Sequence, residues 1–318
     1  MLGSIFRDYP EPSENGYWGR PTSTIDWCEE NYVVSPFVAE WSNTITNGLF
    51  VLLAVFVTYS AIRNNLEKRF WWIGLGFGIV GVGSWFFHMT LLYEFQLLDE
   101  LPMIYATCIP TWSIFSEETE VLRNSNRPAS ISRQLIVGVI VFSSAAILTV
   151  VYLISRNPTF HQTAYAILNV IVVVSAGVLA TKYVKDPLAK QNLVNTMALS
   201  IFIFLSGFAM WQLDIHLCSF WIYIRRSFLR LPLGVLLELH AWWHLLTGTG
   251  VYYYIVHLEY LRTLTHGRAN DYTLIWRWRV FPELILNGKS ISTSYSLELL
   301  GNLEQSNVQE GKHRVKKE

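Results

Sequence analysis

Three histidines of this 318-residue sequence fall inside long apolar segments. An ionisable side chain is energetically costly there, so its presence usually indicates a function. His240 and His244 are four residues apart in LHAWWHLLTG, so both lie on one face of a helix, as two ligands of one metal ion require. His88 belongs to a separate apolar segment, in GSWFFHMT. Because three histidines with an open fourth position are a common ligand set of catalytic zinc, we predict a zinc site here.

Ser84 and Asp99 extend the predicted site. Ser84 precedes His88 by one helical turn on the same face, and Asp99 begins the next apolar segment one short loop later. Zinc lowers the pKa of its bound water from about 15.7 towards about 7, and Asp99 takes the water proton as general base and returns it to the leaving amine. Ser84 orients the water or donates a hydrogen bond to the developing oxyanion. The chemistry that these residues predict is the hydrolysis of a lipid amide.

The remaining histidines are given a structural interpretation, since a single histidine in a membrane helix is more often a packing residue than a metal ligand. His161 and His216 stand at the ends of apolar segments, as interfacial residues or as partners of the zinc ligands. His257, His266 and His313 follow the last apolar segment, and we expect them to be solvated.

An acidic segment, DWCEENYVVSPFVAE, occupies residues 26–40. Asp26, Glu29, Asn31 and Glu40 offer the hard oxygen ligands that calcium prefers. The segment does not match an EF-hand loop, because no glycine occupies the turn position. From spacing alone, an ordinary solvated loop is the favoured interpretation and a calcium site is the alternative.

The composition indicates a membrane protein. Hydrophobic residues make up 52% and charged residues 15% of the chain, whereas a soluble domain has about 25% charged residues. Seven blocks reach the roughly 20 apolar residues that a membrane-crossing helix needs: about 44–62, 70–92, 97–115, 134–154, 162–183, 194–217 and 233–256. The third is the least apolar, because it contains Asp99, Glu100, Pro102 and Pro110. The predicted fold is therefore an all-α, seven-transmembrane-helix bundle with an intramembrane zinc site.

This bundle is expected to form the single catalytic domain, residues 44–256. Residues 1–43 precede it as an N-terminal segment, and residues 257–318 follow it as a polar tail that we expect to be disordered. The N-terminus lacks an apolar core behind a basic start, so it is not a cleavable signal peptide and the first helix is expected to direct insertion. A formal net charge of zero gives no indication of a nucleic-acid partner.

Basic residues in the short loops predict the orientation. The loops opposite the N-terminus carry more of them: Arg63, Lys68, Arg69, Arg123, Arg127, Arg133, Lys182, Lys185, Lys190, Arg262 and Arg268. We therefore expect a lumenal N-terminus and a cytosolic C-terminus, although the basic loop at 225–230 falls on the lumenal side. Cys28 and Cys218 also fall on that side, where an oxidising compartment permits a disulfide between them, while Cys108 is expected to be buried mid-span.

Several motifs, taken together and in this order, resemble those of one family. They are GYWGRPTSTIDWCEENYVVSPFVAEWSNTITN, GSWFFHMTLLYEFQLLDELPM, WQLDIHLC and HAWWHLLTG, spread over residues 16 to about 260. The chain resembles the alkaline ceramidases, and among them the fungal alkaline dihydroceramidases and phytoceramidases.

The resemblance implies roles for particular residues. The zinc ligands of the family correspond to His88, His240 and His244, and its water-holding serine and aspartate to Ser84 and Asp99. Its calcium site corresponds to Asp26, the carbonyl of Trp27, Glu29, Asn31 and Glu40, which reverses the preference for a solvated loop. Its lumenal disulfide corresponds to Cys28 and Cys218, and its tunnel-lining tryptophan to Trp243 rather than Trp242.

By the same resemblance, the substrate is a ceramide taken from the bilayer, such as phytoceramide or dihydroceramide. The products are a sphingoid base and a free fatty acid. Calcium has a structural or regulatory role, the location is the endoplasmic reticulum membrane, and no obligate protein partner is implied.

Two rival functions share part of this pattern. A seven-helix receptor of the adiponectin-receptor type has three histidines that hold a structural zinc ion, and a zinc transporter usually presents a carboxylate-rich relay across several helices. An open water position next to a base favours an enzyme over both.

Overall fold

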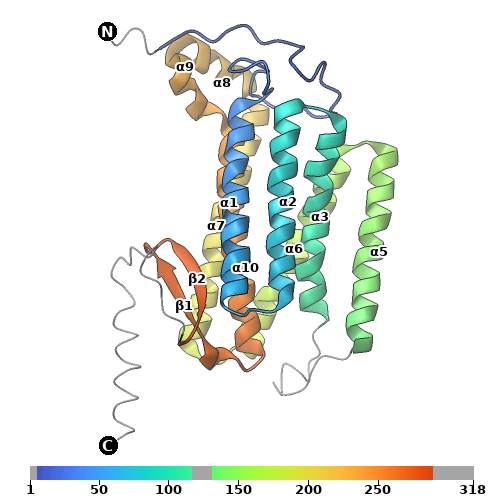
Figure 1. Cartoon of the computed structure of the whole chain (residues 1–318), viewed down its shortest axis with the longest axis vertical. Helices are drawn as coiled ribbons and strands as arrows, with labels where there is room; N and C mark the ends of the chain where they lie inside the picture. The colour runs from blue at the N-terminus through green and yellow to red at the C-terminus, as the bar shows by residue number, and fades with distance from the viewer. Residues whose placement is uncertain (1–5, 117–130, 289–318) are drawn as a thin grey trace, which may run out of the picture.

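The computed structural model describes residues 6–116 and 131–288, and seven long helices run side by side through this part of the chain (Figure 1). They are α1 (Trp41–Arg63), α2 (Lys68–Thr90), α3 (Tyr93–Phe115), α5 (Ile131–Ser155), α6 (Pro158–Tyr183), α7 (Pro187–His216) and α10 (Leu239–Thr265). Each of the seven predicted apolar blocks therefore contains a helix. Five of these helices, α1, α2, α5, α6 and α7, are long and apolar enough to cross a membrane.

The other two long helices pack among these five. Helix α3 carries Glu94, Asp99 and Glu100, and helix α10 carries His240, His244, His257 and Glu259. Helix α10 packs closely against α7 and also contacts α1, while α1, α2 and α3 pack in sequence order. Most side chains of α10 are buried, whereas α5 stands at the outer edge of the bundle in Figure 1.

Helices α7 and α10 approach closely because small residues face each other at their contact. A Cβ atom on Gly250 would lie 3.1 Å from the backbone of both Ser200 and Phe204. The Ser200 hydroxyl donates a 2.9 Å hydrogen bond to the carbonyl of Gly250. Such contacts are typical of helix pairs in membranes, where apolar attraction between helices is weak and close van der Waals packing replaces it.

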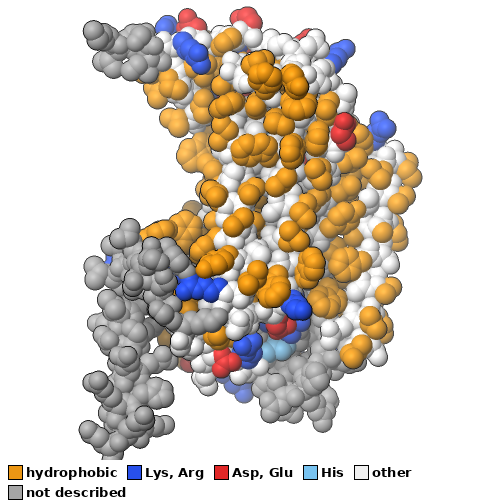
Figure 2. Space-filling model, in the orientation of Figure 1, with side chains coloured by type: hydrophobic (Ala, Val, Ile, Leu, Met, Phe, Trp, Pro, Cys, Tyr) orange, Lys and Arg blue, Asp and Glu red, His pale blue; other side chains and the backbone are white. Residues whose placement is uncertain are grey.

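The surface of the molecule agrees with a membrane-embedded bundle. Figure 2 shows hydrophobic side chains over the middle of the visible face, with charged side chains towards its two ends. Exposed hydrophobic residues are numerous on α5, α6 and α7, among them Leu135, Val139, Ile171, Val174 and Phe202.

The predicted seventh span, 233–256, is wrong at both ends. Short irregular turns occupy the region before α10: α8 (Cys218–Ile224), η2 (Arg225–Leu229), α9 (Arg230–Leu233) and η3 (Gly234–Leu237). Pro232 lacks an N–H group for a regular helix, and Leu231 exchanges two backbone hydrogen bonds with Arg7 of the N-terminal segment. These interactions hold the segment outside the bundle, so that α10 begins only at Leu239.

The prediction of a disordered tail from residue 257 is also wrong, as far as residue 288. Helix α10 continues to Thr265, and after η4 (Ala269–Asp271) the antiparallel strands β1 (Tyr272–Arg277) and β2 (Phe281–Leu286) form a hairpin. Glu283 accepts a 2.8 Å hydrogen bond from Ser60 of α1, and it also pairs with Arg277. These buried polar contacts fix the hairpin to the bundle.

His257 is buried rather than solvated, because α10 continues through it. Its Nδ1 lies 3.2 Å from the Thr196 hydroxyl. Residues 289–318, which include His313, lie outside the described part of the chain, as does the predicted basic loop with Arg123 and Arg127.

Residues 6–40 run across the ends of the helices, at the end of the bundle opposite the hairpin (Figure 1). A disulfide joins Cys28 of this segment to Cys218 at the start of α8. Tyr32 accompanies Ala39, Phe87 and Leu91 in a small apolar cluster. The N-terminal segment is therefore attached to both α2 and the region after α7.

Gly83 lets α2 and α3 approach at the level of the predicted site. A Cβ atom at this position would lie 2.0 Å from the carbonyl oxygen of Leu98 and 3.1 Å from the amide nitrogen of Asp99. Only a residue without a side chain fits here, and the contact sets the depth of Asp99 beside Ser84.

Replacing Gly83 by alanine is therefore expected to push α3 away from α2 and to destabilise the protein by about 1–3 kcal/mol, as overpacked cores do. Gly177→Ala in α6 is the matched control, because a Cβ atom there has no neighbour within 4 Å. Thermal unfolding of both variants in detergent measures the difference, and equal melting temperatures would contradict the assignment of a tight α2–α3 contact.

Candidate metal centre

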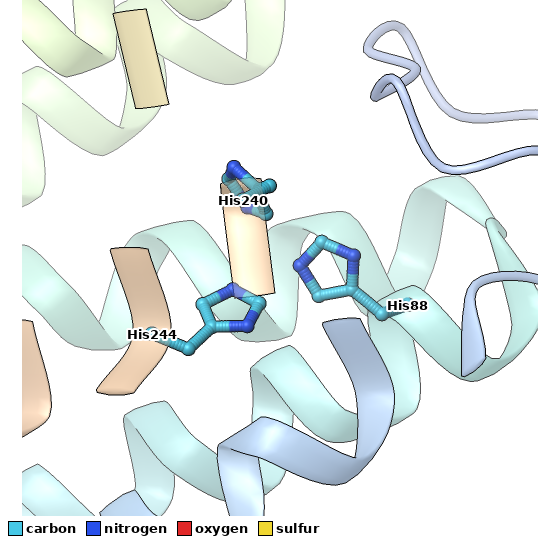
Figure 3. A group of neighbouring side chains, drawn as sticks. All are labelled: His88, His240 and His244. Atoms are coloured by element: carbon cyan, nitrogen blue, oxygen red, sulfur yellow. The ribbon is translucent and has the colours of Figure 1, made fainter. Parts of the chain in front are cut away.

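The three predicted zinc ligands converge on one point. His88 comes from the last turn of α2, and His240 and His244 come from the first two turns of α10 (Figure 3). One potential ligand atom from each lies within 4.8 Å of the others, and all three side chains are buried. Their ring centroids are 4.7–5.2 Å apart. This spacing allows a single ion to contact all three.

Hydrogen bonds orient two of the three rings. The Nδ1 atom of His88 lies 2.5 Å from a carboxylate oxygen of Glu40, and the Nδ1 atom of His244 lies 3.1 Å from the hydroxyl of Thr46. In both rings the Nε2 atom is left for a metal. Partners of this kind fix the tautomer and the direction of a metal-ligating imidazole. Three imidazoles fit zinc in their donor chemistry.

His240 is held differently. Its ring stacks on Trp27 of the N-terminal segment, with centroids 4.1 Å apart and planes inclined by 16°. Its Nδ1 atom is buried and has no hydrogen-bond partner among the described residues.

Asp99 and Ser84 form a pair next to this cluster. The Ser84 side chain hydrogen-bonds the Asp99 carboxyl, and Ser84 lies one turn before His88 on α2. Asp99 is not among the residues whose atoms converge as metal ligands. Asp99 is therefore paired with a residue one turn from His88 and does not belong to the converging group itself.

Tyr165 of α6 also interacts electrostatically with Asp99, and sequence reasoning missed it. The available signal was weak: Tyr165 follows His161 by one helical turn, so both lie on one face of α6.

Trp243 and Trp242 face different ways, as adjacent helical positions must. Trp243 contacts the rings of Phe204 and Trp211 on α7, at 5.4 and 5.3 Å between centroids. Trp242 is 39% exposed and donates a hydrogen bond to the carbonyl of Leu236. Trp243 therefore belongs to an aromatic group that reaches His240 through Trp211, whose ring lies 6.5 Å from it.

The acidic segment forms a second cluster of oxygen atoms. Glu29 and Glu40 are buried and close enough to repel each other, and Asp26 interacts with Glu40 in the same way. One carboxylate oxygen of Glu40 and the side-chain oxygen of Asn31 are buried without a hydrogen-bond partner in the described chain. No described Lys or Arg pairs with Glu29 or Glu40. Several buried oxygens without a cationic partner fit a calcium ion.

Burial raises the pKa of Glu29 to about 7, and the negative charge of Glu40 contributes to this shift. Burial likewise raises the pKa of Glu40 well above its usual value. The two oxygens of Glu29 also accept hydrogen bonds of 2.7 and 2.8 Å from the backbone N–H groups of Ser42 and Asn43. Glu29 thus satisfies the free N–H groups at the start of α1.

Glu40 connects the two clusters. One of its oxygens contacts His88, and the other faces the acidic segment without a partner in the described residues. The side chain therefore interacts with both the acidic segment and the predicted zinc ligand on α2.

Comparison with known proteins supports the resemblance seen in the motifs. A family model described as Ceramidase matches residues 19–285. Alkaline ceramidase YPC1 of Saccharomyces cerevisiae is 57% identical over 300 residues, which cover 93% of this chain and 95% of that protein. The chain belongs to the alkaline ceramidase family.

More distant relatives bear the same family name. Alkaline ceramidase 3 of Mus musculus is 41% identical over 257 residues, covering 80% of this chain and 90% of the relative. Alkaline ceramidase 1 of Mus musculus is 28% identical over 241 residues, covering 74% and 78%. The family match includes the β1–β2 hairpin, so it extends beyond residue 260, where the sequence motifs ended.

The buried carboxylates of the acidic segment predict that the stabilising effect of calcium depends on pH. In calcium-free protein, Glu29 must lose its proton while buried, so folding stability falls as pH rises from the usual glutamate pKa of 4.5 towards about 7. A bound calcium ion favours the ionised carboxylates, so its stabilising effect is expected to be larger at about pH 8 than at about pH 5.5.

Melting temperatures with excess calcium or with a calcium chelator, at both pH values, measure this effect. Glu29→Gln is the matched variant, since it removes the titrating group but keeps the side-chain shape. It should reduce the pH dependence of the calcium effect, and the raised pKa of Glu40 should account for the part that remains. A calcium effect of the same size at both pH values would contradict the prediction.

Proposed function

We propose that the chain, an enzyme of the alkaline ceramidase family, is a zinc-dependent intramembrane amidase. It hydrolyses the N-acyl amide bond of ceramides, such as phytoceramide and dihydroceramide, and releases a sphingoid base and a free fatty acid. The observation that carries the proposal is the convergence of His88, His240 and His244 beside the Ser84–Asp99 pair. The names of the relatives support the substrate class.

The three histidines would hold the zinc ion, and their burial keeps them neutral and able to ligate. Zinc, when bound, makes water acidic enough to react at neutral to alkaline pH and polarises the amide carbonyl. The remaining chemistry belongs to the side chains around it.

Asp99 accepts a proton from the water that attacks the amide carbonyl carbon. Ser84 holds the Asp99 carboxyl in place and orients the attacking water. As the C–N bond breaks, Asp99 returns the same proton to the nitrogen, so the sphingoid base leaves as a neutral amine and the acyl group leaves as a fatty acid. Tyr165 of α6 interacts electrostatically with Asp99, so it would adjust the charge of this base rather than take part in the proton transfer.

The substrate would reach this site from the bilayer. In this proposal α3 and α10 complete a seven-span bundle with the five apolar helices, and their charged groups are turned towards the bundle interior. The N-terminal segment and both metal sites would face the lumen of the endoplasmic reticulum, and the hairpin would face the cytosol. Trp243 would line the path of an aliphatic chain. Calcium would regulate activity through Glu40 without taking part in the reaction.

A receptor with a structural zinc ion is the weaker proposal, because the Ser84–Asp99 pair would then have no role. One assay separates the two. Purified protein is given phytoceramide and dihydroceramide under alkaline conditions with calcium, with and without a zinc chelator. Release of sphingoid base that is lost on chelation and restored by zinc supports the enzyme, and absence of release under all conditions contradicts it.

Two substitutions are expected to separate metal binding from proton transfer. Asp99→Asn removes the base, so it should lower kcat by about 10²–10⁴-fold while zinc content stays at the wild-type level. His240→Ala should remove both zinc and turnover. Metal analysis of the purified variants beside the activity assay tests this, and full zinc content in His240→Ala would remove this residue from the ligand set.

A further inference from the structure

Asp214 has no role in the reaction proposed above, although it is completely buried within the WQLDIHLC motif near the end of α7. One of its carboxylate oxygens accepts a 3.3 Å hydrogen bond from the backbone N–H of His240 on α10. The other accepts a 3.3 Å hydrogen bond from the backbone N–H of Cys28 in the N-terminal segment. A single carboxylate therefore joins three separate parts of the chain.

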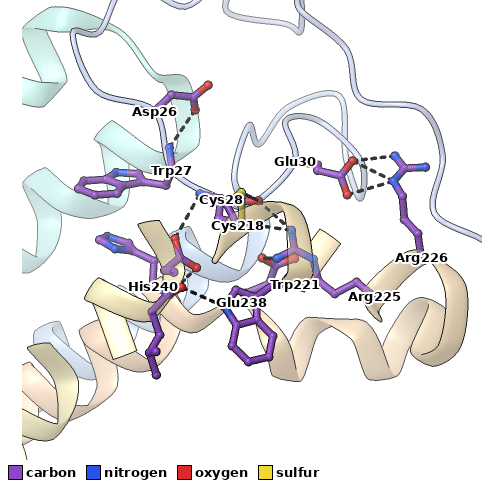
Figure 4. Close-up of a disulfide and its surroundings, with 12 residues drawn as sticks. Asp26, Trp27, Cys28, Glu30, Cys218, Trp221, Arg225, Arg226, Glu238 and His240 are labelled. Atoms are coloured by element: carbon purple, nitrogen blue, oxygen red, sulfur yellow. Dashed lines mark hydrogen bonds and ion pairs between the residues drawn. A yellow bond between two sulfur atoms is a disulfide. The ribbon is translucent and has the colours of Figure 1, made fainter. Parts of the chain in front are cut away.

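Cys28 is held on its other side as well (Figure 4). Its carbonyl accepts a 2.8 Å hydrogen bond from the guanidinium of Arg225, which is fully buried and also pairs with Glu238. Its sulfur is bonded to Cys218. Glu238 immediately precedes α10, and its carbonyl accepts the N–H of Ala241. The N–H, carbonyl and sulfur of Cys28 are thus all fixed to the region around the start of α10.

The residue positioned by these contacts is Trp27, the neighbour of Cys28. Its ring stacks on His240 at 4.1 Å, and Trp211, one turn before Asp214 on α7, contacts the Trp27 ring at 5.9 Å. Figure 4 shows Trp27 directly facing His240. His240 is therefore held in two ways: the Trp27 indole stacks on its ring, and Asp214 binds its backbone N–H.

This arrangement explains how His240 is oriented without the Nδ1 hydrogen bond that the other two histidines make. Glu40 orients His88, and Thr46 orients His244, each through an Nδ1 atom. The side chain of His240 has no such partner among the described residues. Other contacts must therefore set the direction of the His240 ring. The structure supplies two: the hydrogen bond from the His240 backbone N–H to Asp214, and the stack of the ring on Trp27.

We infer that Asp214 is a positioning residue for His240: through two backbone N–H groups it holds the start of α10 and the Trp27 segment against each other, and so sets the affinity of the predicted metal site. The inference rests on the proposed zinc site. It is distinct from a simple helix cap, which would stabilise α10 without affecting metal affinity.

The chain offers a matched control on the same helix. Asp186 caps the other end of α7 by accepting the N–H of Ala189 at 2.7 Å, far from the histidines in sequence and at the opposite end of the helix. Full-length Asp214→Asn and Asp186→Asn proteins are compared for zinc affinity, by competition with a metal-binding dye, and for the visible absorption spectrum after Co²⁺ substitution.

Asp214→Asn keeps the side-chain volume but has only one oxygen to accept two N–H groups. It is expected to weaken zinc binding by about 10–100-fold, as loss of supporting contacts does at other metal sites, and to change the Co²⁺ spectrum. In Asp186→Asn the amide oxygen can still accept the capping N–H, so this variant is expected to leave zinc affinity and spectrum unchanged. Wild-type zinc affinity in folded Asp214→Asn protein, or equal weakening in both variants, would overturn the inference.

Trp27→Leu provides a second test in case Asp214→Asn does not fold. It removes the stacked ring but keeps the backbone carbonyl predicted for calcium, and it is expected to weaken zinc binding by about 10-fold. Unchanged zinc affinity in this variant contradicts the inference. If the wild-type protein binds no zinc, the proposed function itself fails, so the two failures are distinguishable.

Discussion

The contact between Glu40 and His88 is the interaction that joins the histidine cluster to the acidic segment. It joins the residue before α1 to the last turn of α2, at a depth where neither side chain meets water. A buried carboxylate is stable only with hydrogen bonds or a cation, and a buried imidazole that ligates a metal needs an acceptor for its second nitrogen. Each group therefore satisfies the other. The second carboxylate oxygen of Glu40 is buried without a hydrogen-bond partner in the described residues, and Asp26 of the acidic segment interacts with this carboxylate.

The packing of the other helices places further polar side chains at this depth. Gly83 brings α3 against α2 so that Asp99 meets Ser84. Gly248, where a Cβ atom would lie 2.9 Å from the Phe50 ring, brings the part of α10 that follows His240 and His244 close to α1. The N-terminal segment then covers the assembled ends. In the proposed reaction, burial would serve the chemistry as well as the fold, because electrostatic interactions strengthen in a site without bulk water.

The sequence was sufficient for the parts of this picture that follow a period or a fixed spacing. Apolar length located the helices to within a few residues for five of the seven blocks, whereas α7 begins seven residues before its predicted block. The four-residue spacing of His240 and His244 placed them on one face. It failed where contacts between distant segments decide the structure. The late start of α10 depends on pairing between Leu231 and Arg7, and the order of residues 266–288 depends on buried contacts of Glu283 with α1.

The same reason explains which site residues were missed. Tyr165 and Asp214 belong to segments whose apolar pattern reads as ordinary membrane helix, and no spacing within α6 or α7 links them to a histidine on another helix. The role of Glu40 as a partner of His88 was equally hidden, because the two are 48 residues apart and meet only through the turn of the chain between α1 and α2. Motif spacing identifies candidate ligands that share a helix. The residues that support those ligands come from other segments, so they can be identified only from the folded structure.

The disulfide has a consequence for biosynthesis. Cys28 and Cys218 are separated by 190 residues, so the bond between them can form only after α7 has been synthesised. Until then no disulfide joins the segment that supplies Trp27 and Glu40 to the region that precedes His240. The first part of the chain to emerge is thus among the last to be fixed, and a nascent chain that has not yet made α10 cannot hold a complete set of metal ligands.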